Sequence, residues 1–234
     1  MIIIGCQNVN YDEAYAKNDK YKNASQSDNE MPKEKIRYVA IGDSYTIGEG
    51  ASEEESWPSL LAKHLQNEGI KIELIANPSR TGWTTNDAIN YELPIYKKSK
   101  PDFATLLIGV NDWVQGISRD ELRKSLAFLM DEMLKELPNN ERLLIVTIPD
   151  FSATPNGRLY SNGRDISQGI LEFNDIIKEE AKKRNLKIVD TYPLSQGMKN
   201  DRTLVARDGL HPSAKEYALW EKEIFPLAFE ILKK

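Results

Sequence analysis

The feature that most constrains this chain is a regular alternation of short apolar runs with longer amphipathic segments after residue 35. Five runs rich in Ile, Leu and Val predict strands, at residues 36–41, 70–76, 103–108, 143–148 and 186–190. Segments with helical spacing follow them, at residues 57–67, 84–98, 118–137, 166–184 and from 212 onward. Strands that alternate with helices form a parallel sheet covered on both faces. We therefore predict an α/β fold, a three-layer α/β/α sandwich.

Capping residues and prolines set the expected ends of these helices. Ser118 with Glu121 has the spacing of a capping box, and Pro58 follows Ser56 at the start of an earlier helix. Pro94 lies inside the segment 84–98 and should kink or split that helix. Pro212 is expected at the first position of the last helix.

Composition limits the classes of function. The 234 residues suffice for one domain over residues 36–234 plus a tail, and the net charge of −5 lacks the basic excess of nucleic-acid-binding proteins. Two histidines and one cysteine are too few for a His/Cys zinc site, although the many Asp and Glu residues leave an all-oxygen cation site open. We expect no metal, no cofactor and no nucleic-acid partner, and the sequence does not predict the oligomeric state.

The N-terminal residues 1–35 are polar after a short apolar start and are expected to form a flexible tail. The run Ile-Ile-Ile-Gly-Cys at residues 2–6 resembles the end of a bacterial lipoprotein signal, in which Cys6 would carry the lipid. The basic start and most of the apolar core of such a signal are missing. Two expectations follow: a cell-envelope protein tethered to a membrane through Cys6, or a cytoplasmic protein with a plain polar tail.

Two segments carry the residues needed to activate a nucleophile. Gly-Asp-Ser, ending at Ser44, directly follows the first predicted strand, and Asp208 and His211 lie three residues apart in a turn before the last helix. A serine hydroxyl needs an adjacent base, and that base needs a group to hold its tautomer. His64 lies in a charged helical segment and is expected on the solvated surface. Turn and helix-cap roles remain the alternative for each segment alone.

Two further loops after strands offer hydrogen-bond donors. Gly82 closes a loop after the second strand, where a glycine lets the backbone N–H approach a ligand. Asn111 follows the third strand, and its side-chain amide can donate. Simple turn formation is the alternative for both. The unusually long segment 149–165 is a candidate lid or substrate wall.

These blocks, taken in order, resemble the SGNH/GDSL hydrolases over residues 36–234. The resemblance implies Ser44 as nucleophile, His211 as base with Asp208 as its partner, and an oxyanion hole of Ser44, Gly82 and Asn111. It also implies a flavodoxin-like five-stranded sheet of order 2-1-3-4-5, with no cofactor. Tyr45 replaces the leucine that gives the family its name, and no double glycine precedes Trp83. Both departures concern substrate preference.

The expected activity is hydrolysis of carboxylic esters with small or medium acyl groups, including acetyl esters of glycans. Asp43, Tyr45, Trp83 and Trp113 lie beside the catalytic blocks and are the expected substrate contacts. A lysophospholipase or thioesterase is favoured instead if the segment 149–165 forms a long apolar groove. A non-catalytic carbohydrate- or lipid-binding module with the same fold is the alternative from another class.

Overall fold

A computed structural model describes residues 35–234, and its centre is a five-stranded parallel sheet of order β2-β1-β3-β4-β5. The strands are β1 (Ile36–Gly42), β2 (Ile72–Ala76), β3 (Phe103–Leu107), β4 (Leu143–Val146) and β5 (Lys187–Val189). Every residue of β3 and β4 is buried, which explains why these strands are continuous apolar runs. The predicted α/β class and strand order are confirmed.

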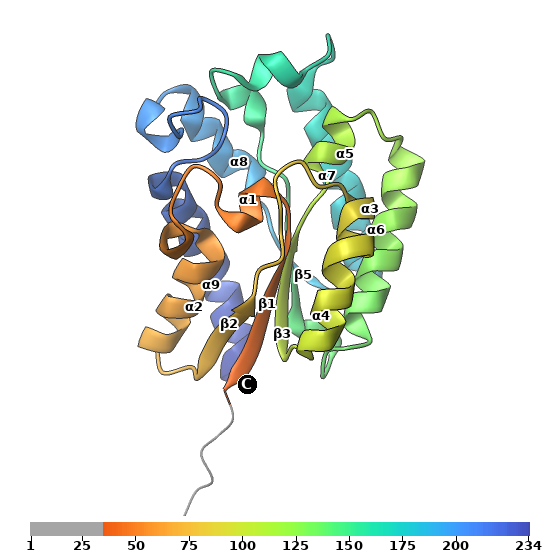
Figure 1. The fold of residues 1–234 in the computed structure, drawn as a ribbon, viewed down its shortest axis with the longest axis vertical. Coiled ribbons are helices and arrows are strands. Elements are labelled where there is room, and N and C mark those ends of the chain that lie inside the picture. The colour runs from red at the N-terminus through yellow and green to blue at the C-terminus, as the bar shows by residue number, and fades with distance from the viewer. Residues whose placement is uncertain (1–34) are drawn as a thin grey trace, which may run out of the picture. The chain divides into compact units, whose positions relative to one another are not determined.

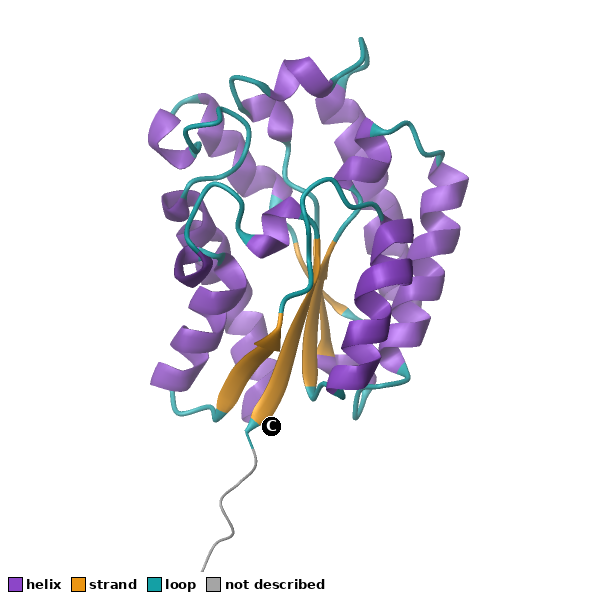
Figure 2. Ribbon diagram, in the orientation of Figure 1, coloured by secondary structure: helices purple, strands orange, loops and turns teal. Residues whose placement is uncertain are grey.

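Helices cover both faces of the sheet and give three layers (Figures 1 and 2). One face carries α2 (Trp57–Asn67) and α9 (Ala214–Lys233), which pack against each other. The other face carries α3 (Thr85–Asp87), α4 (Leu93–Ser99), α6 (Arg119–Leu134) and α7 (Ile166–Lys183). Three short helices complete the set: α1 (Ser44–Ile47), α5 (Val110–Val114) and α8 (Tyr192–Ser195). Within the described residues, no helix is long and apolar enough to cross a membrane.

The sheet and its helices enclose one large apolar core. Trp57, Tyr217 and Trp220 are fully buried where α2 and α9 meet. Each fully buried Leu or Ile side chain in such a core contributes roughly 1.5–3 kcal/mol relative to an exposed one. The Trp220 ring packs edge-on against Tyr45 at 5.8 Å, so the core directly supports the segment that follows β1.

The helix ends follow the expected capping chemistry, with one correction. Ser118 caps α6 in a capping box with Glu121, as predicted. The helix expected over residues 84–98 is interrupted before Pro94 by a π-helical segment, Ala88–Glu92, so the predicted disturbance is confirmed. The prediction for Pro212 is wrong, because α9 begins at Ala214 and the Ser213 side chain caps it.

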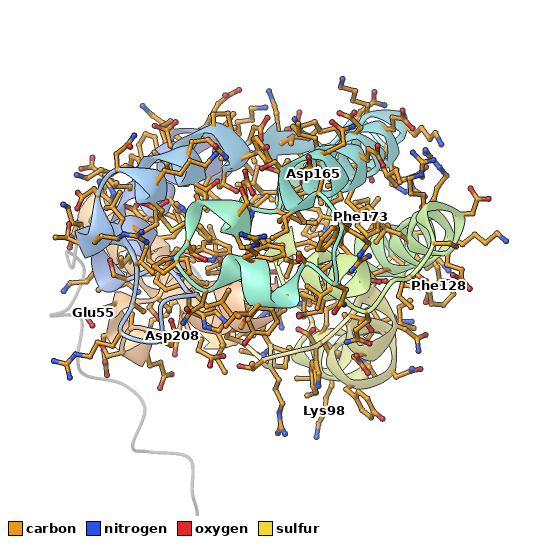
Figure 3. All side chains as sticks on the ribbon, turned by 90° about the horizontal axis from the view of Figure 1, so that it is seen from above. Glu55, Lys98, Phe128, Asp165, Phe173 and Asp208 are labelled. Carbon is orange, nitrogen blue, oxygen red and sulfur yellow. The ribbon has the colours of Figure 1, made fainter. Side chains whose placement is uncertain are left out.

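Short helices and loops gather at the carboxyl ends of the strands, where Figure 3 views the molecule from above. Asp208 lies there on the loop that precedes α9, and Asp165 lies on the loop that precedes α7. Open parallel sheets bind their ligands at this end. Cys6 and the tail that contains it lie outside the described residues, so the membrane tether stays a prediction.

Candidate active site

A cleft of about 520 Å³ opens at the carboxyl ends of the strands. The predicted catalytic and oxyanion-hole residues all line it: Ser44, Gly82, Asn111, Asp208 and His211. They come from four separate segments, so the fold brings together residues up to 167 positions apart. The cleft is therefore the candidate active site.

Ser44 is the first residue of α1 and is separated from the end of β1 by Asp43 alone. Asp43 caps this short helix, because its side chain accepts a hydrogen bond of 3.0 Å from the Tyr45 amide. The Ser44 amide stands at the helix start, where backbone N–H groups have no partner within the helix. Ser44 is 5% exposed as a residue, and its hydroxyl makes no hydrogen bond with a described residue. Both groups are thus available to a ligand in the cleft.

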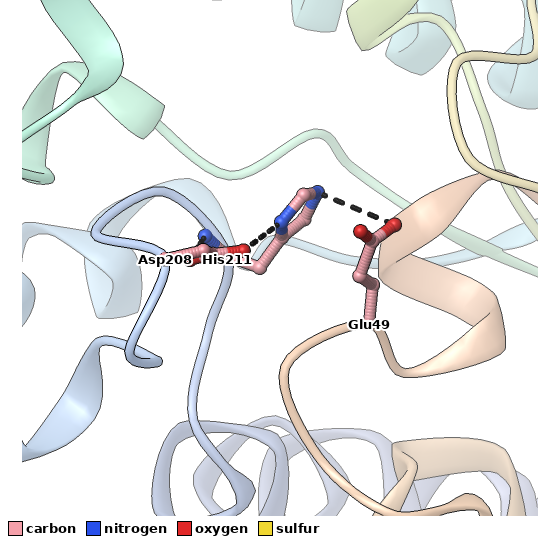
Figure 4. Close-up of side chains that lie close together, drawn as sticks. All are labelled: Glu49, Asp208 and His211. Carbon is pink, nitrogen blue, oxygen red and sulfur yellow. Dashed lines mark hydrogen bonds and ion pairs between the residues drawn. The ribbon is translucent and has the colours of Figure 1, made fainter.

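Asp208 holds His211 through three hydrogen bonds. One carboxylate oxygen lies 2.6 Å from His211 Nδ1, and the other accepts the amides of Leu210 at 2.8 Å and His211 at 3.0 Å (Figure 4). Partial burial alone would raise the pKa of Asp208, but these hydrogen bonds hold that pKa below its ordinary value. A charged Asp208 keeps the proton on Nδ1 and leaves Nε2 free to accept one.

Asn156 ties the base loop to the segment 149–165. Its side-chain amide donates to the Asp208 carbonyl at 2.6 Å, and its backbone N–H donates to the Gly209 carbonyl at 2.8 Å. Sequence reasoning missed this residue, because nothing in the local pattern distinguishes Asn156 from any other loop asparagine.

Gly82 and Asn111 supply the remaining donors. Gly82 has a φ of 81°, a left-handed conformation that favours glycine, and its N–H has no partner among the described residues. Asn111 Nδ2 donates one hydrogen bond of 2.9 Å to the Trp83 carbonyl, which fixes the amide and leaves its second N–H available. With the Ser44 amide, these groups can stabilise an oxyanion formed at Ser44.

Two buried carboxyl groups, those of Asp43 and Glu92, hold the backbone on either side of Ser44 through hydrogen bonds. Burial raises the pKa of Asp43 to about 8, and burial likewise raises the pKa of Glu92 to about 8. Glu92 accepts hydrogen bonds from the Gly42 amide at 3.0 Å and the Ser79 hydroxyl at 3.4 Å. It therefore connects the loop that carries the serine to the loop that carries Gly82. Sequence reasoning missed Glu92, although an acid at the end of a disturbed helix was a visible signal.

The expected substrate contacts are only partly placed on the cleft. Tyr45 lines it, with its ring 6.0 Å from the His211 ring. Asp43 is fully buried as a helix cap. Trp113 is 4% exposed and lies between Phe151 and Arg164. Neither residue lines the cleft, which corrects the prediction that both contact the substrate. Trp83 stacks on Tyr91 outside the cleft wall.

His64 lies away from the cleft, in the contact between α2 and α9. Its Nδ1 is 2.8 Å from Glu221 Oε1, and its ring stacks on Phe225 at 3.6 Å. The prediction that His64 lies on the solvated surface is therefore wrong, because the residue is half-buried between the two helices. His211 is left as the histidine of the cleft.

The segment 149–165, for which the sequence left a lid or a substrate wall open, lines one side of the cleft. It contributes Phe151, Leu159 and Tyr160 together with Asn156. Leu159 is 75% exposed, which is unusual for a leucine. Val110, Val114 and Leu210 extend this apolar side of the cleft.

Glu49 is the second acidic side chain of the cleft, and sequence reasoning missed it. One of its carboxylate oxygens lies 3.8 Å from His211 Nε2, on the side opposite to Asp208 (Figure 4). The side chains of Glu49, Asp208 and His211 each offer one possible metal-ligand atom, and these atoms lie within 4.8 Å of one another. Within residues 35–234, this is the set of side chains close enough together to bind a metal ion. The position of Glu49 between Gly48 and Gly50, five residues after Ser44, was the available signal.

Comparison with known proteins gives a consistent result. The family model described as GDSL-like Lipase/Acylhydrolase matches residues 40–219. An arylesterase of Vibrio mimicus is 25% identical over 177 residues, which cover 75% of this chain and 80% of that protein. A multidomain esterase of Ruminococcus flavefaciens is 31% identical over 124 residues, which cover 52% of this chain but only 15% of that longer protein.

Solved structures share the fold. A lipase/acylhydrolase from Enterococcus faecalis superposes with a TM-score of 0.66 at 24% identity, covering 84% of this chain and 97% of that one. An acetylxylan esterase from Geobacillus stearothermophilus gives a TM-score of 0.66 at 19% identity, covering 82% of this chain and 94% of that one. These similarities establish a common architecture.

Proposed function

The chain belongs to the GDSL-like lipase/acylhydrolase family, and from this we propose that it hydrolyses carboxylic esters of small or medium acyl groups through an acyl-enzyme on Ser44. The family makes it a serine ester hydrolase. The observation that carries the proposal is the meeting of Ser44, the Asp208–His211 pair and the donors of Gly82 and Asn111 in one cleft.

In the first half of the reaction, Ser44 Oγ attacks the ester carbonyl and His211 Nε2 takes the hydroxyl proton. Negative charge develops on the carbonyl oxygen, where the amides of Ser44 and Gly82 and the Asn111 side chain stabilise it. His211 then gives the proton to the departing alkoxide, and the acyl group stays on Ser44.

In the second half, water attacks the acyl-enzyme while His211 accepts one of its protons. The tetrahedral intermediate uses the same N–H donors, and its collapse returns the proton to Ser44 Oγ and releases the carboxylic acid. Asp208 stays charged throughout, because its role is to orient the imidazole and to stabilise the imidazolium.

Acetyl esters of glycans are the substrate class we favour within this proposal. The acetylxylan esterase and a family 3 carbohydrate esterase of Clostridium thermocellum share the fold, and the names of these two enzymes support a glycan ester as substrate. The alternative of a non-catalytic binding module is disfavoured, because a binding role needs neither a free serine hydroxyl nor a histidine held by a carboxylate.

Longer acyl chains are the second candidate, and one observation favours them. Phe151, Leu159 and Tyr160 form an apolar wall together with Val110 and Val114 on one side of the cleft. An acyl chain of several carbons could bury its surface there, at a gain of ~0.8 kcal/mol for each buried CH₂ group.

The test is hydrolysis of p-nitrophenyl esters from acetate to palmitate by the unaltered protein and its Ser44→Ala variant. We expect activity on short chains that is abolished in Ser44→Ala and kept in the control Ser99→Ala, which alters a serine outside the cleft wall. A preference for acetate supports the acetyl esterase, and a preference for octanoate or longer supports the second candidate. Activity that survives in Ser44→Ala contradicts the proposed mechanism.

A further inference from the structure

We propose that Glu49 determines which alcohol groups the enzyme releases: it selects against esters whose alcohol portion carries a negative charge and favours those with a positive one. The inference rests on the proposed function, because it concerns the substrate of that same cleft. Three features support it: the fixed position of Glu49, its place beside His211, and the charges that line the cleft.

The backbone of Glu49 is held in place on both sides. Its N–H donates to the carbonyl of Ser44 at 2.9 Å, and its carbonyl accepts the Tyr217 hydroxyl at 2.9 Å. At Gly50, an added Cβ would lie 2.7 Å from the Pro212 carbonyl oxygen, so this loop packs tightly against the base loop. Glu49 is therefore part of the rigid frame of the site.

The Glu49 side chain points into the space beside the base. One oxygen accepts the Thr81 hydroxyl and lies 3.8 Å from His211 Nε2 (Figure 4). His211 Nε2 is the atom that protonates the leaving alkoxide, so the alcohol portion of a bound ester must lie next to it. The Glu49 carboxylate is thus adjacent to the alcohol portion of the substrate.

No cation in the described part of the chain offsets this charge within the cleft wall. Glu49 and Asp208 are the acidic residues that line it, and neither Lys nor Arg does among residues 35–234. Asp208 uses both oxygens to hold the His211 loop. The other Glu49 oxygen, Oε1, accepts no hydrogen bond from a described residue. Two nearby arginines lie over tryptophan rings outside the wall: Arg80 over Trp83, and Arg164 over Trp113.

The expected consequence is electrostatic. A phosphate, sulfate or carboxylate on the alcohol would lie close to the negative Glu49, whereas an ammonium group there would be attracted. The Glu49 side chain is 37% exposed, so solvent and salt reduce the effect without removing it. Neutral alcohols, such as uncharged sugars, remain substrates.

The experiment uses three acetate esters with similar chain length and different alcohol charge. They are acetylcholine, the uncharged 3,3-dimethylbutyl acetate, and 3-acetoxypropane-1-sulfonate. The value compared is the quotient of kcat/KM for the cationic ester over kcat/KM for the anionic ester. Any effect of a substitution on the chemical step common to all three esters cancels in this quotient.

In the unaltered protein we expect a quotient well above one, and in Glu49→Gln a decrease of about tenfold. The control Glu54→Gln removes the same charge from an exposed position outside the cleft wall and should leave the quotient unchanged. About 0.5 M NaCl should lower the quotient in the unaltered protein. This salt measurement needs no substitution, so it tests the inference even if Glu49→Gln fails to fold.

Three results would overturn the inference: a quotient near one, a quotient that Glu49→Gln changes by less than twofold, or one that salt does not alter. In each case serine-dependent hydrolysis of the uncharged ester would still uphold the proposed function. Absence of hydrolysis of all three esters would instead contradict the proposed function itself.

Discussion

At the scale of single residues, the proposed mechanism depends most on how Asp208 holds His211. One carboxylate accepts the imidazole N–H and two backbone amides, so it fixes both the ring and the turn that carries it. A carboxylate that only neutralised charge would not need this geometry. The pair is therefore built to keep one tautomer of His211.

Replacing Asp208 with Asn tests this role. The amide keeps one oxygen for the backbone N–H groups, but its NH₂ group faces Nδ1 and favours the wrong tautomer of His211. We expect kcat to fall by about 10²- to 10⁴-fold, with a circular dichroism spectrum like that of the unaltered protein. Asp175→Asn, on the exposed side of α7, is the matched control. Equal kcat values for the two variants would exclude Asp208 from the mechanism.

The sequence predicted part of this site and missed part of it, for one physical reason. Ser44 and His211 were found because each lies in a short segment whose neighbouring residues indicate its role: Gly-Asp precedes Ser44, and Asp208 lies three residues before His211. Glu49 and Glu92 each gave a local signal, but the sequence does not show which residues lie beside them in space, and their roles depend on those neighbours. Asp43 was misjudged for the same reason, since its position beside Ser44 did not reveal that it is fully buried.

At the scale of elements, the segment 149–165 sets the shape of the cleft. Two 3₁₀ turns, Phe151–Ala153 and Gly157–Tyr160, give it a defined path along one side of the cleft. Its most exposed apolar side chain is Leu159. An exposed side chain contributes little to stability, so we expect substitution of Leu159 to affect substrate preference more than folding.

Leu159→Ala should therefore change the acyl-chain preference. We expect kcat/KM for p-nitrophenyl octanoate to fall about three- to tenfold relative to the acetate, because a longer chain loses apolar contact. The thermal midpoint should stay within about 2 °C of the unaltered value. Leu171→Ala, an exposed leucine on α7 outside the cleft wall, is the control. An unchanged octanoate-to-acetate ratio would show that acyl chains do not reach this wall.

Helices and strands were predictable from the sequence where local patterns, such as apolar runs and capping residues, agree with the packing of the core. The apolar runs became strands, and Ser118 became a helix cap, because burial and capping act over a few residues. Pro212 was misplaced because two start signals stand side by side, and the side chain of Ser213 supplies the cap. Pro94 indicated a disturbed helix but not its π-helical form over residues 88–92, nor the hydrogen bond that Glu92, at the end of this segment, accepts from the Gly42 amide.

At the scale of the whole molecule, buried acids make stability depend on pH. The pKa values of Asp43 and Glu92 are raised to about 8 and that of Glu216 to about 7, in each case chiefly by burial. Between the ordinary carboxyl pKa of about 4 and these values, the folded state binds more protons than the unfolded state. The free energy of unfolding must therefore fall as pH rises through this window.

We expect urea unfolding to give a lower free energy of unfolding at about pH 8 than at about pH 5. Glu92→Gln should reduce this difference, since glutamine does not ionise and keeps an oxygen for the Gly42 amide. Glu68→Gln, at an exposed position after α2, should leave the difference unchanged. A difference of equal size in Glu92→Gln would show that this buried acid does not cause it.

Covalent labelling can establish whether Ser44 is a nucleophile activated by His211. The protein would be treated with diisopropyl fluorophosphate and its intact mass and labelled peptide measured, alongside Ser44→Ala. We expect one adduct per chain, located on Ser44, with loss of ester hydrolysis in step with labelling and no adduct in the variant. Labelling of a different serine, or full hydrolytic activity in protein fully labelled at Ser44, would contradict the proposed mechanism.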